Sequence, residues 1–287
     1  AGGSGDVLAR LIAEPMTQQL GQQVVVDNRP GANGIIGMEL VSKANPDGYT
    51  LVVVSTGNIA INPTLYGDKL PFRVEQDFAP VTLIANTAFV AHVSPQFQAK
   101  SIKELIALAK AQPKTINYAS GGTGSTPHFM GVLFELLAGV QMTHVPYKSG
   151  PLGRVAVMSR EADIMFDGLL PTLPLFKSGR LRPLGVTGGK RAAAAPDIPT
   201  IAEGGVAGYD AETWYAMFAP KGTPPAVIGK LSSTLQRTLQ SPEMKEKLQA
   251  QGGEALGSTP EALAKFLKAE IAKWGKVVKA SGAKPEQ

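Results

Sequence analysis

The sequence contains no cysteine, and only 6% of its residues are aromatic. The absence of cysteine excludes disulfide scaffolds, cysteine-ligated zinc, iron–sulfur clusters and cysteine nucleophiles. No hydrophobic run approaches the roughly 18 residues that a membrane-spanning helix needs. The few aromatic residues do not interleave with lysine and arginine, so the net charge of +5 does not indicate nucleic-acid binding. A mild positive charge fits the attraction of anionic solutes better.

Histidine is also scarce, with His92, His128 and His144 as the three examples. None has an acidic residue at metal-ligand spacing, and His-Glu-x-x-His is absent. We therefore predict no metal site and no cofactor. Ser125, His128 and Asp167 could form a hydrolase triad, although no Gly-x-Ser-x-Gly motif supports it. A hydrolase that uses these three residues stays open as an alternative.

Patterns typical of helices and strands alternate along the whole chain. The segments expected to form strands are 23–26, 49–55, 117–120, 143–147, 162–166 and 182–187. Between them, a first helix should end at Gly21, and the capping box Ser101-Ile102-Lys103-Glu104 should begin a helix that ends before Pro113. This alternation predicts an α/β fold with two domains, each a mainly parallel sheet flanked by helices.

The domain organisation follows from length and from the lack of a linker. A chain of 287 residues is too long for one ordinary core, and no serine- or glycine-rich linker divides it. We expect the chain to cross between domains on strands near 89–94 and 213–220. Domain 1 is thus predicted as residues 1–98 plus 212–287, and domain 2 as the inserted residues 99–211.

Two glycine-rich loops, at 1–6 and 120–126, each lead directly into a helix. Backbone N–H groups at a helix N-terminus are unpaired and carry the positive end of the dipole, so such loops bind anions. Two of them in separate domains predict a cleft for a small molecule with a carboxylate at each end. Neither has the spacing of a P-loop or a dinucleotide fingerprint. Because no strand precedes the first loop, we also expect a first strand and a signal peptide upstream of Ala1.

Polar residues follow two of the predicted strands. Asp167 comes directly after the strand at 162–166, at the sheet edge where α/β proteins bind ligands. Its alternative role is to cap the helix that follows. Ser55, Thr56 and Asn58 lie at another strand end, and capping the next segment is likewise their alternative role. Asp167 and Ser55 are therefore candidate ligand contacts.

Ordered motifs along the chain resemble one family of receptors. They are Gly-Gly-Ser-Gly-Asp at 2–6, Val-Asp-Asn-Arg-Pro-Gly-Ala-Asn-Gly at 26–34, Asn-Pro-Asp-Gly-Tyr-Thr-Leu at 45–51, Tyr-Ala-Ser-Gly-Gly-Thr-Gly-Ser at 118–125, His-Val-Pro-Tyr-Lys at 144–148 and Met-Phe-Asp at 165–167. With later motifs they span essentially the whole chain. The sequence thus resembles the TctC-like, or Bug-type, periplasmic solute-binding proteins of tripartite tricarboxylate transporters.

This resemblance implies a type II periplasmic-binding-protein-like (flytrap) fold whose two domains close on a ligand. It implies a periplasmic protein that is not an enzyme and that delivers a small organic carboxylate to integral-membrane components of the transporter. The ligand could be a dicarboxylate, an acidic amino acid, a tricarboxylate or an aromatic acid. We expect a monomer without nucleic acid. A sensory or interaction protein of the same fold is the other alternative.

The family's ligand contacts are backbone amides and hydroxyls of the two loops. Carried over, the expected contacts are Gly3, Ser4, Ser120, Gly121, Thr123, Gly124 and Asp167, with Thr87 and Ser55 added. The run Pro151-Leu152-Gly153-Arg154 departs from the small residues usual in the family. We expect Arg154 to lie on the surface; an inward-facing Arg154 would favour a ligand with a second acidic group.

Overall fold

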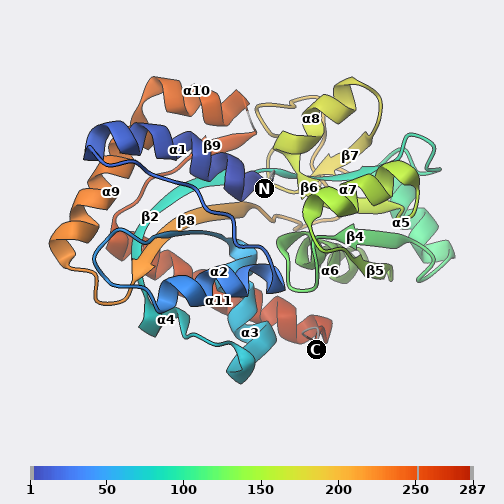
Figure 1. Cartoon of the computed structure of the whole chain (residues 1–287). Helices are drawn as coiled ribbons and strands as arrows, with labels where there is room; N and C mark the ends of the chain where they lie inside the picture. Colours follow the sequence, from blue (N-terminus) through green and yellow to red (C-terminus); the bar gives the residue numbers. More distant parts are fainter. Residues whose placement is uncertain (1–2, 251, 285–287) are drawn as a thin grey trace. The chain divides into compact units, whose positions relative to one another are not determined.

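The computed structural model describes residues 3–250 and 252–284 (Figure 1). The chain divides into two compact units. Unit 1 comprises Ala1–Asn86, Trp214–Gln249 and Glu254–Gln287, and unit 2 comprises Thr87–Thr213 and Ala250–Gly253. Each unit contains its own sheet, flanked by helices. In the described ranges no helix combines the length and the apolar character needed to cross a membrane.

The unit boundaries follow strand pairing. Strand β3 (Phe89–Val93) pairs with β6 (Ile164–Gly168) and β7 (Arg182–Val186), so it belongs to the sheet of unit 2. Unit 2 therefore begins at Thr87, before the expected boundary at residue 99. Gly252 is tied to the same unit, because the Ala88 N–H donates to the Gly252 carbonyl at 3.1 Å.

Unit 1 is built on a four-stranded sheet in the order β1-β8-β2-β9. Its strands are β1 (Val52–Ser55), β8 (Thr213–Pro220), β2 (Phe78–Thr87) and β9 (Gly253–Ala255). β1 runs antiparallel to β8. Successive side chains of a strand point to opposite faces, so Tyr215 and Met217 join one core while Trp214 lies on the other face.

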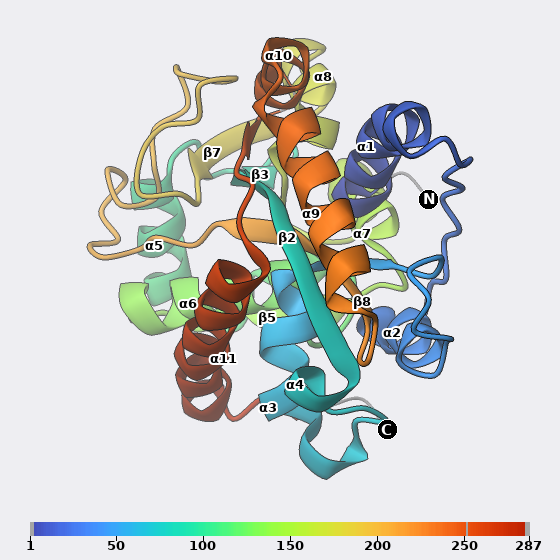
Figure 2. The same cartoon turned by 90° about the vertical axis from the view of Figure 1, so that its left-hand side faces the viewer.

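Helices cover both faces of this sheet (Figure 2). On one face, α1 (Ser4–Leu20), α9 (Pro225–Gln240) and α10 (Pro242–Ala250) bury apolar stripes against β2 and β8. On the other, α11 (Pro260–Ser281) places Phe266 against Trp214, and Glu270 accepts a hydrogen bond from the Trp214 indole at 2.8 Å. The remaining elements of unit 1 are η1 (Ala32–Gly34), α2 (Ile35–Ser42), η2 (Gly57–Ile61), α3 (Asn62–Tyr66), η3 (Gly67–Lys69) and α4 (Val74–Asp77).

The predicted strand at 23–26 is wrong. These residues lie outside any sheet, and Val25 is 74% exposed. A cavity of about 860 Å³ is lined by this segment, by β1 and by apolar side chains such as Ile12 and Met38. An isolated segment cannot pair its backbone groups as a strand does, and β1 is an edge strand among the described residues. The run at 23–26 and β1 line the same cavity, but the run pairs with no strand among the described residues.

Unit 2 contains a five-stranded sheet in the order β5-β4-β6-β3-β7. β5 (Thr143–Pro146), β4 (Asn117–Ser120) and β6 are parallel, whereas β3 runs antiparallel to both of its neighbours. The four strands predicted between residues 117 and 187 are all confirmed, with ends within two residues of those expected.

The helices of unit 2 are α5 (Ile102–Ala111), α6 (Thr126–Ala138), α7 (Gly150–Ser159) and α8 (Leu169–Lys177). α6 follows β4, α7 follows β5 and α8 follows β6. Because these three strands are parallel neighbours, the three helices begin at the same edge of the sheet, beyond the carboxyl ends of the strands. We call this the carboxyl edge of unit 2. Most of the predicted ligand contacts lie there.

Candidate functional site

The glycine-rich loop between β4 and α6 is held in one shape by backbone conformation and internal hydrogen bonds. Gly122 and Gly124 have φ angles of +114° and +88°, where a side chain is strained. The Ser125 hydroxyl donates to the Gly122 carbonyl at 2.6 Å, and the Ser125 N–H donates to the same oxygen at 3.1 Å. The loop is therefore a tight turn that leads directly into α6.

Ser120 ends β4 and is fully buried. Its hydroxyl accepts the Gly122 N–H at 3.1 Å and lies 2.7 Å from Nε2 of His144. Ser120 thus anchors the start of the loop. Thr123, further along, is half-buried. Direct contact between a ligand and either hydroxyl stays a prediction.

Gly121 brings the loop against the N-terminus of α7. A Cβ atom there would lie 3.0 Å from the backbone nitrogen of Gly150. Gly153, one turn into α7, also packs closely, because its Cβ would lie 3.3 Å from the Ser120 carbonyl oxygen. The two glycines therefore allow the starts of α6 and α7 to approach each other at the carboxyl edge.

Three rings pack against one another next to the loop. The ring centroids of His128 and His144 are 4.0 Å apart, and those of Tyr118 and His144 are 5.0 Å apart. Burial, together with the proximity of His144, lowers the pKa of His128 to about 3. His128 is therefore neutral near pH 7, and its Nδ1 accepts the Gly124 N–H at 3.2 Å.

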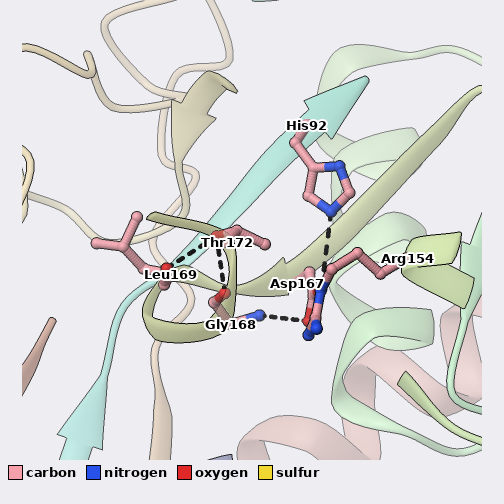
Figure 3. A network of polar contacts seen from close by, with 6 residues as sticks. All are labelled: His92, Arg154, Asp167, Gly168, Leu169 and Thr172. Atoms are coloured by element: carbon pink, nitrogen blue, oxygen red, sulfur yellow. Dashed lines mark hydrogen bonds and ion pairs between the residues drawn. The ribbon is translucent and has the colours of Figure 1, made fainter. Parts of the chain in front are cut away.

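Asp167 lies at the carboxyl edge near the end of β6, and its side chain is 8% exposed. Its Oδ2 accepts a hydrogen bond from Nε of Arg154 at 2.5 Å and lies 3.7 Å from Nε2 of His92. Its Oδ1 accepts the Gly168 N–H at 2.8 Å. Figure 3 shows His92 above this carboxylate and the Arg154 side chain reaching it from the right.

The electrostatics of this cluster favour a carboxylate. Burial raises the pKa of Asp167, but the contacts with His92 and Arg154 outweigh burial and bring the pKa below its usual value. Asp167 is thus ionised and paired with Arg154. Asp167 does not cap α8. The N-cap residue of that helix is Gly168, and no side chain accepts a capping hydrogen bond there.

The expectation that Arg154 lies on the surface is wrong. Its side chain is only 13% exposed and points to Asp167. Arg154 lies in the helix after β5 and Asp167 lies near the end of β6, two strands along the sheet, so their proximity follows from a strand order that the local sequence does not reveal. Opposite charges at the same edge of a parallel sheet are placed to pair.

Three further predicted contacts lie in unit 1. Ser55 ends β1, and both its N–H and its hydroxyl donate to Oδ1 of Asn58, at 2.9 and 2.8 Å. Gly3 is the N-cap of α1, and Ser4 is the first residue of that helix. The loop residues Ala1 and Gly2 lie outside the described residues. In the described part of the chain, no predicted ligand contact lines the cavity of unit 1.

Thr87 begins unit 2 and is buried. Its hydroxyl has no hydrogen-bond partner among the described residues. A buried hydroxyl without a partner is costly, so a water or a ligand group is expected to satisfy it. The role of Thr87 as a ligand contact stays a prediction.

The structure does not assemble the hydrolase triad. Ser125 donates to a backbone carbonyl, His128 accepts a backbone N–H through Nδ1, and Asp167 is paired with Arg154. A triad requires the serine hydroxyl bonded to the histidine and the histidine bonded to the acid. The three residues thus make other contacts.

Comparison with known proteins shows the family. Residues 8–283 match the model of the tripartite tricarboxylate transporter family receptor, TctC. Among solved structures, R. palustris Rpa4515 with adipate is 35% identical, with a TM-score of 0.95 over 100% of this chain and 95% of that one. The periplasmic binding protein BugD is 33% identical, with a TM-score of 0.92 over 100% and 96%. MatC (Rpa3494) from Rhodopseudomonas palustris with bound malate is 30% identical, with a TM-score of 0.88 over 97% and 95%.

The matches agree with both the fold and the sequence motifs. The α/β units have the fold of periplasmic binding proteins. TctC proteins are periplasmic solute receptors and not enzymes, so the hydrolase alternative is wrong. By its matched length and its structure, this chain belongs to the TctC family of tripartite tricarboxylate transporter receptors.

Proposed function

We propose that this receptor binds a small organic carboxylate at the carboxyl edge of unit 2 and delivers it to the integral-membrane components of a tripartite transporter. One observation carries the proposal: α6, α7 and α8 all begin at this edge, next to the loop at 120–125. The first N–H groups of a helix have no partner within it and carry the positive end of the dipole. Three such ends side by side suit a carboxylate.

The chemistry of the edge supports an anion in a second way. The one carboxylate described above, that of Asp167, is already paired with Arg154. His128 is neutral and holds the loop through the Gly124 N–H. The negative charge of Asp167 next to the helix N-termini at this edge is therefore compensated, which favours binding of an anion.

The ligands of two relatives support the same chemical class. Rpa4515 is described with adipate and MatC with malate, both of which are dicarboxylates. We infer a dicarboxylate for this receptor, with tricarboxylates, acidic amino acids and aromatic acids as the other classes to test. The contacts proposed in unit 2 are Ser120, Gly121, Thr123, Gly124, Asp167 and Thr87. Gly3, Ser4 and Ser55 of unit 1 stay predicted contacts.

A thermal-shift screen against mono-, di- and tricarboxylates and aromatic acids tests the proposal. A ligand that binds the native state raises the melting temperature in proportion to its concentration and affinity. We expect one class of acid, the dicarboxylates, to do so in a saturable way. Failure of every acid to shift the melting temperature would contradict the proposed function.

Gly121→Ala tests the location. The added Cβ would push the loop away from the start of α7, and we expect affinity for the acid to fall by at least about tenfold. The matched control is Gly229→Ala within α9 of unit 1, where an added Cβ meets nothing within 4 Å. Equal affinity of the two folded variants would place the ligand elsewhere.

A further inference from the structure

The pair of Arg154 and Asp167 occupies the edge where the carboxylate is proposed to bind. Arg154 is the fifth residue of α7, and Asp167 is the penultimate residue of β6, close to the start of α8. Nε of the guanidinium contacts Oδ2 at 2.5 Å, with the two side chains 13% and 8% exposed. The pair is thus largely buried, yet it lies beside the three helix starts.

An unpaired Asp167 would act on ligands in two ways. Its negative charge would repel a ligand carboxylate, and it would attract an ammonium group such as that of an amino acid. Arg154 removes both effects, because a guanidinium cation already occupies the space at Oδ2. The other group that faces this oxygen is His92 on β3, which is completely buried and therefore closes that side to a ligand.

We propose that Arg154 is a specificity-determining residue that makes this receptor select carboxylates without an ammonium group. The guanidinium occupies the position at Asp167 that the ammonium group of an acidic amino acid would require, and it repels that group. This inference rests on the proposed function and narrows it by excluding acidic amino acids from the classes of ligand.

Matched pairs of ligands test the inference on the wild-type protein. Calorimetric titration compares succinate with aspartate, glutarate with glutamate, and adipate with 2-aminoadipate. In the pair that contains the best ligand, we expect the unaminated acid to bind at least about tenfold more tightly, because two like charges are otherwise brought together. Equal or tighter binding of the amino acid would overturn the inference.

Variants then assign the discrimination to Arg154. Arg154→Ala uncovers Asp167, so we expect the preference to shift toward the amino acid by about tenfold or more. Arg154→Lys keeps the cation and should keep the wild-type preference. The double variant Arg154→Ala with Asp167→Asn removes the exposed carboxylate and should lose the shift. A folded Arg154→Ala protein with an unchanged ratio of affinities would contradict the assignment.

The control for net charge is Arg180→Ala. Arg180 is exposed and precedes β7, at the opposite edge of the same sheet. The Arg180→Ala substitution removes the same charge and should leave the ratio of the two affinities unchanged. An equal shift of this ratio in Arg180→Ala would overturn the role of Arg154. If Arg154→Ala fails to fold, the ratios of affinities measured on the wild type and on Arg154→Lys still test the inference. Absence of binding by any acid would contradict the proposed function, whereas binding without discrimination would contradict the inference alone.

Discussion

At the scale of single residues, two glycines of unit 2 provide a matched comparison. Gly122 in the loop and Gly205 in a distant turn have nearly equal φ angles, +114° and +111°. An alanine is strained at both, so both variants should lose similar stability. Only Gly122→Ala should weaken binding of the acid, by about tenfold, because it distorts the loop that positions the start of α6. Titration of both variants checks this, and equal losses of affinity would contradict it.

His128 should make the stability of the protein depend on pH. Its pKa is about 3 in the folded chain and 6.5 in the unfolded chain, so the unfolded chain binds the proton first as the pH falls. The contribution of His128 is complete above pH 6.5 and is lost as the pH falls toward 3, by up to about 1.4 kcal/mol per pH unit. Urea unfolding at pH 7 and pH 4 should show a smaller loss for His128→Gln than for the wild type. Equal losses would show that His128 is not held neutral.

The residues of the site were only partly predictable. The loop at 120–126 begins at the end of β4 and Asp167 lies near the end of β6; both positions are predictable, because glycine clusters and polar residues next to apolar strands are local signals. The burial of Arg154 was not predictable, because it depends on which strands are neighbours in the sheet. The ring packing of Tyr118, His128 and His144 has the same non-local origin.

At the scale of elements, helix caps account for where several helices begin. The Ser101 hydroxyl accepts the Glu104 N–H at 3.2 Å, and the Glu104 carboxylate accepts the Lys100 N–H at 2.8 Å. This is close to the predicted capping box and satisfies two backbone donors at the start of α5. At the start of α11 the Thr259 hydroxyl likewise accepts the Ala262 N–H, at 3.2 Å.

Ser101→Ala should therefore lower the free energy of unfolding by about 1 kcal/mol. Ser149 is the matched control, because it is the N-cap of α7 without a side-chain cap hydrogen bond. Ser149→Ala should cost clearly less. Denaturant unfolding of both variants measures the difference, and equal losses would show that the hydrogen bond to Glu104 is not what stabilises the start of α5.

The elements were more predictable where the signal is local. Caps, prolines and apolar stripes predicted the helices, and β-rich runs predicted the strands of unit 2. The run at 23–26 has the same local pattern. It lies beside a cavity, however, and is paired with no strand among the described residues. A strand depends on a partner that the run itself does not reveal, which is why this prediction failed.

At the scale of the whole molecule, the motifs predicted the family because different motifs follow one another in the family's order along the entire chain. Chain length and the alternation of helix and strand patterns predicted two domains, and the structure has two compact units with separate sheets. The exact boundaries required strand pairing, as β3 shows. Motifs could not give the ligand, since selectivity depends on contacts such as that between Arg154 and Asp167. Closure of the two domains on a ligand stays a prediction.

Amide chemical shifts of the labelled protein, recorded while a dicarboxylate is added, test the central claim most directly. The account predicts that the largest changes occur at Gly121, Gly122, Gly124 and Gly150, where the loop meets the start of α7. Changes confined to residues that line the cavity of unit 1, such as Val24, Val53 and Met38, would contradict it.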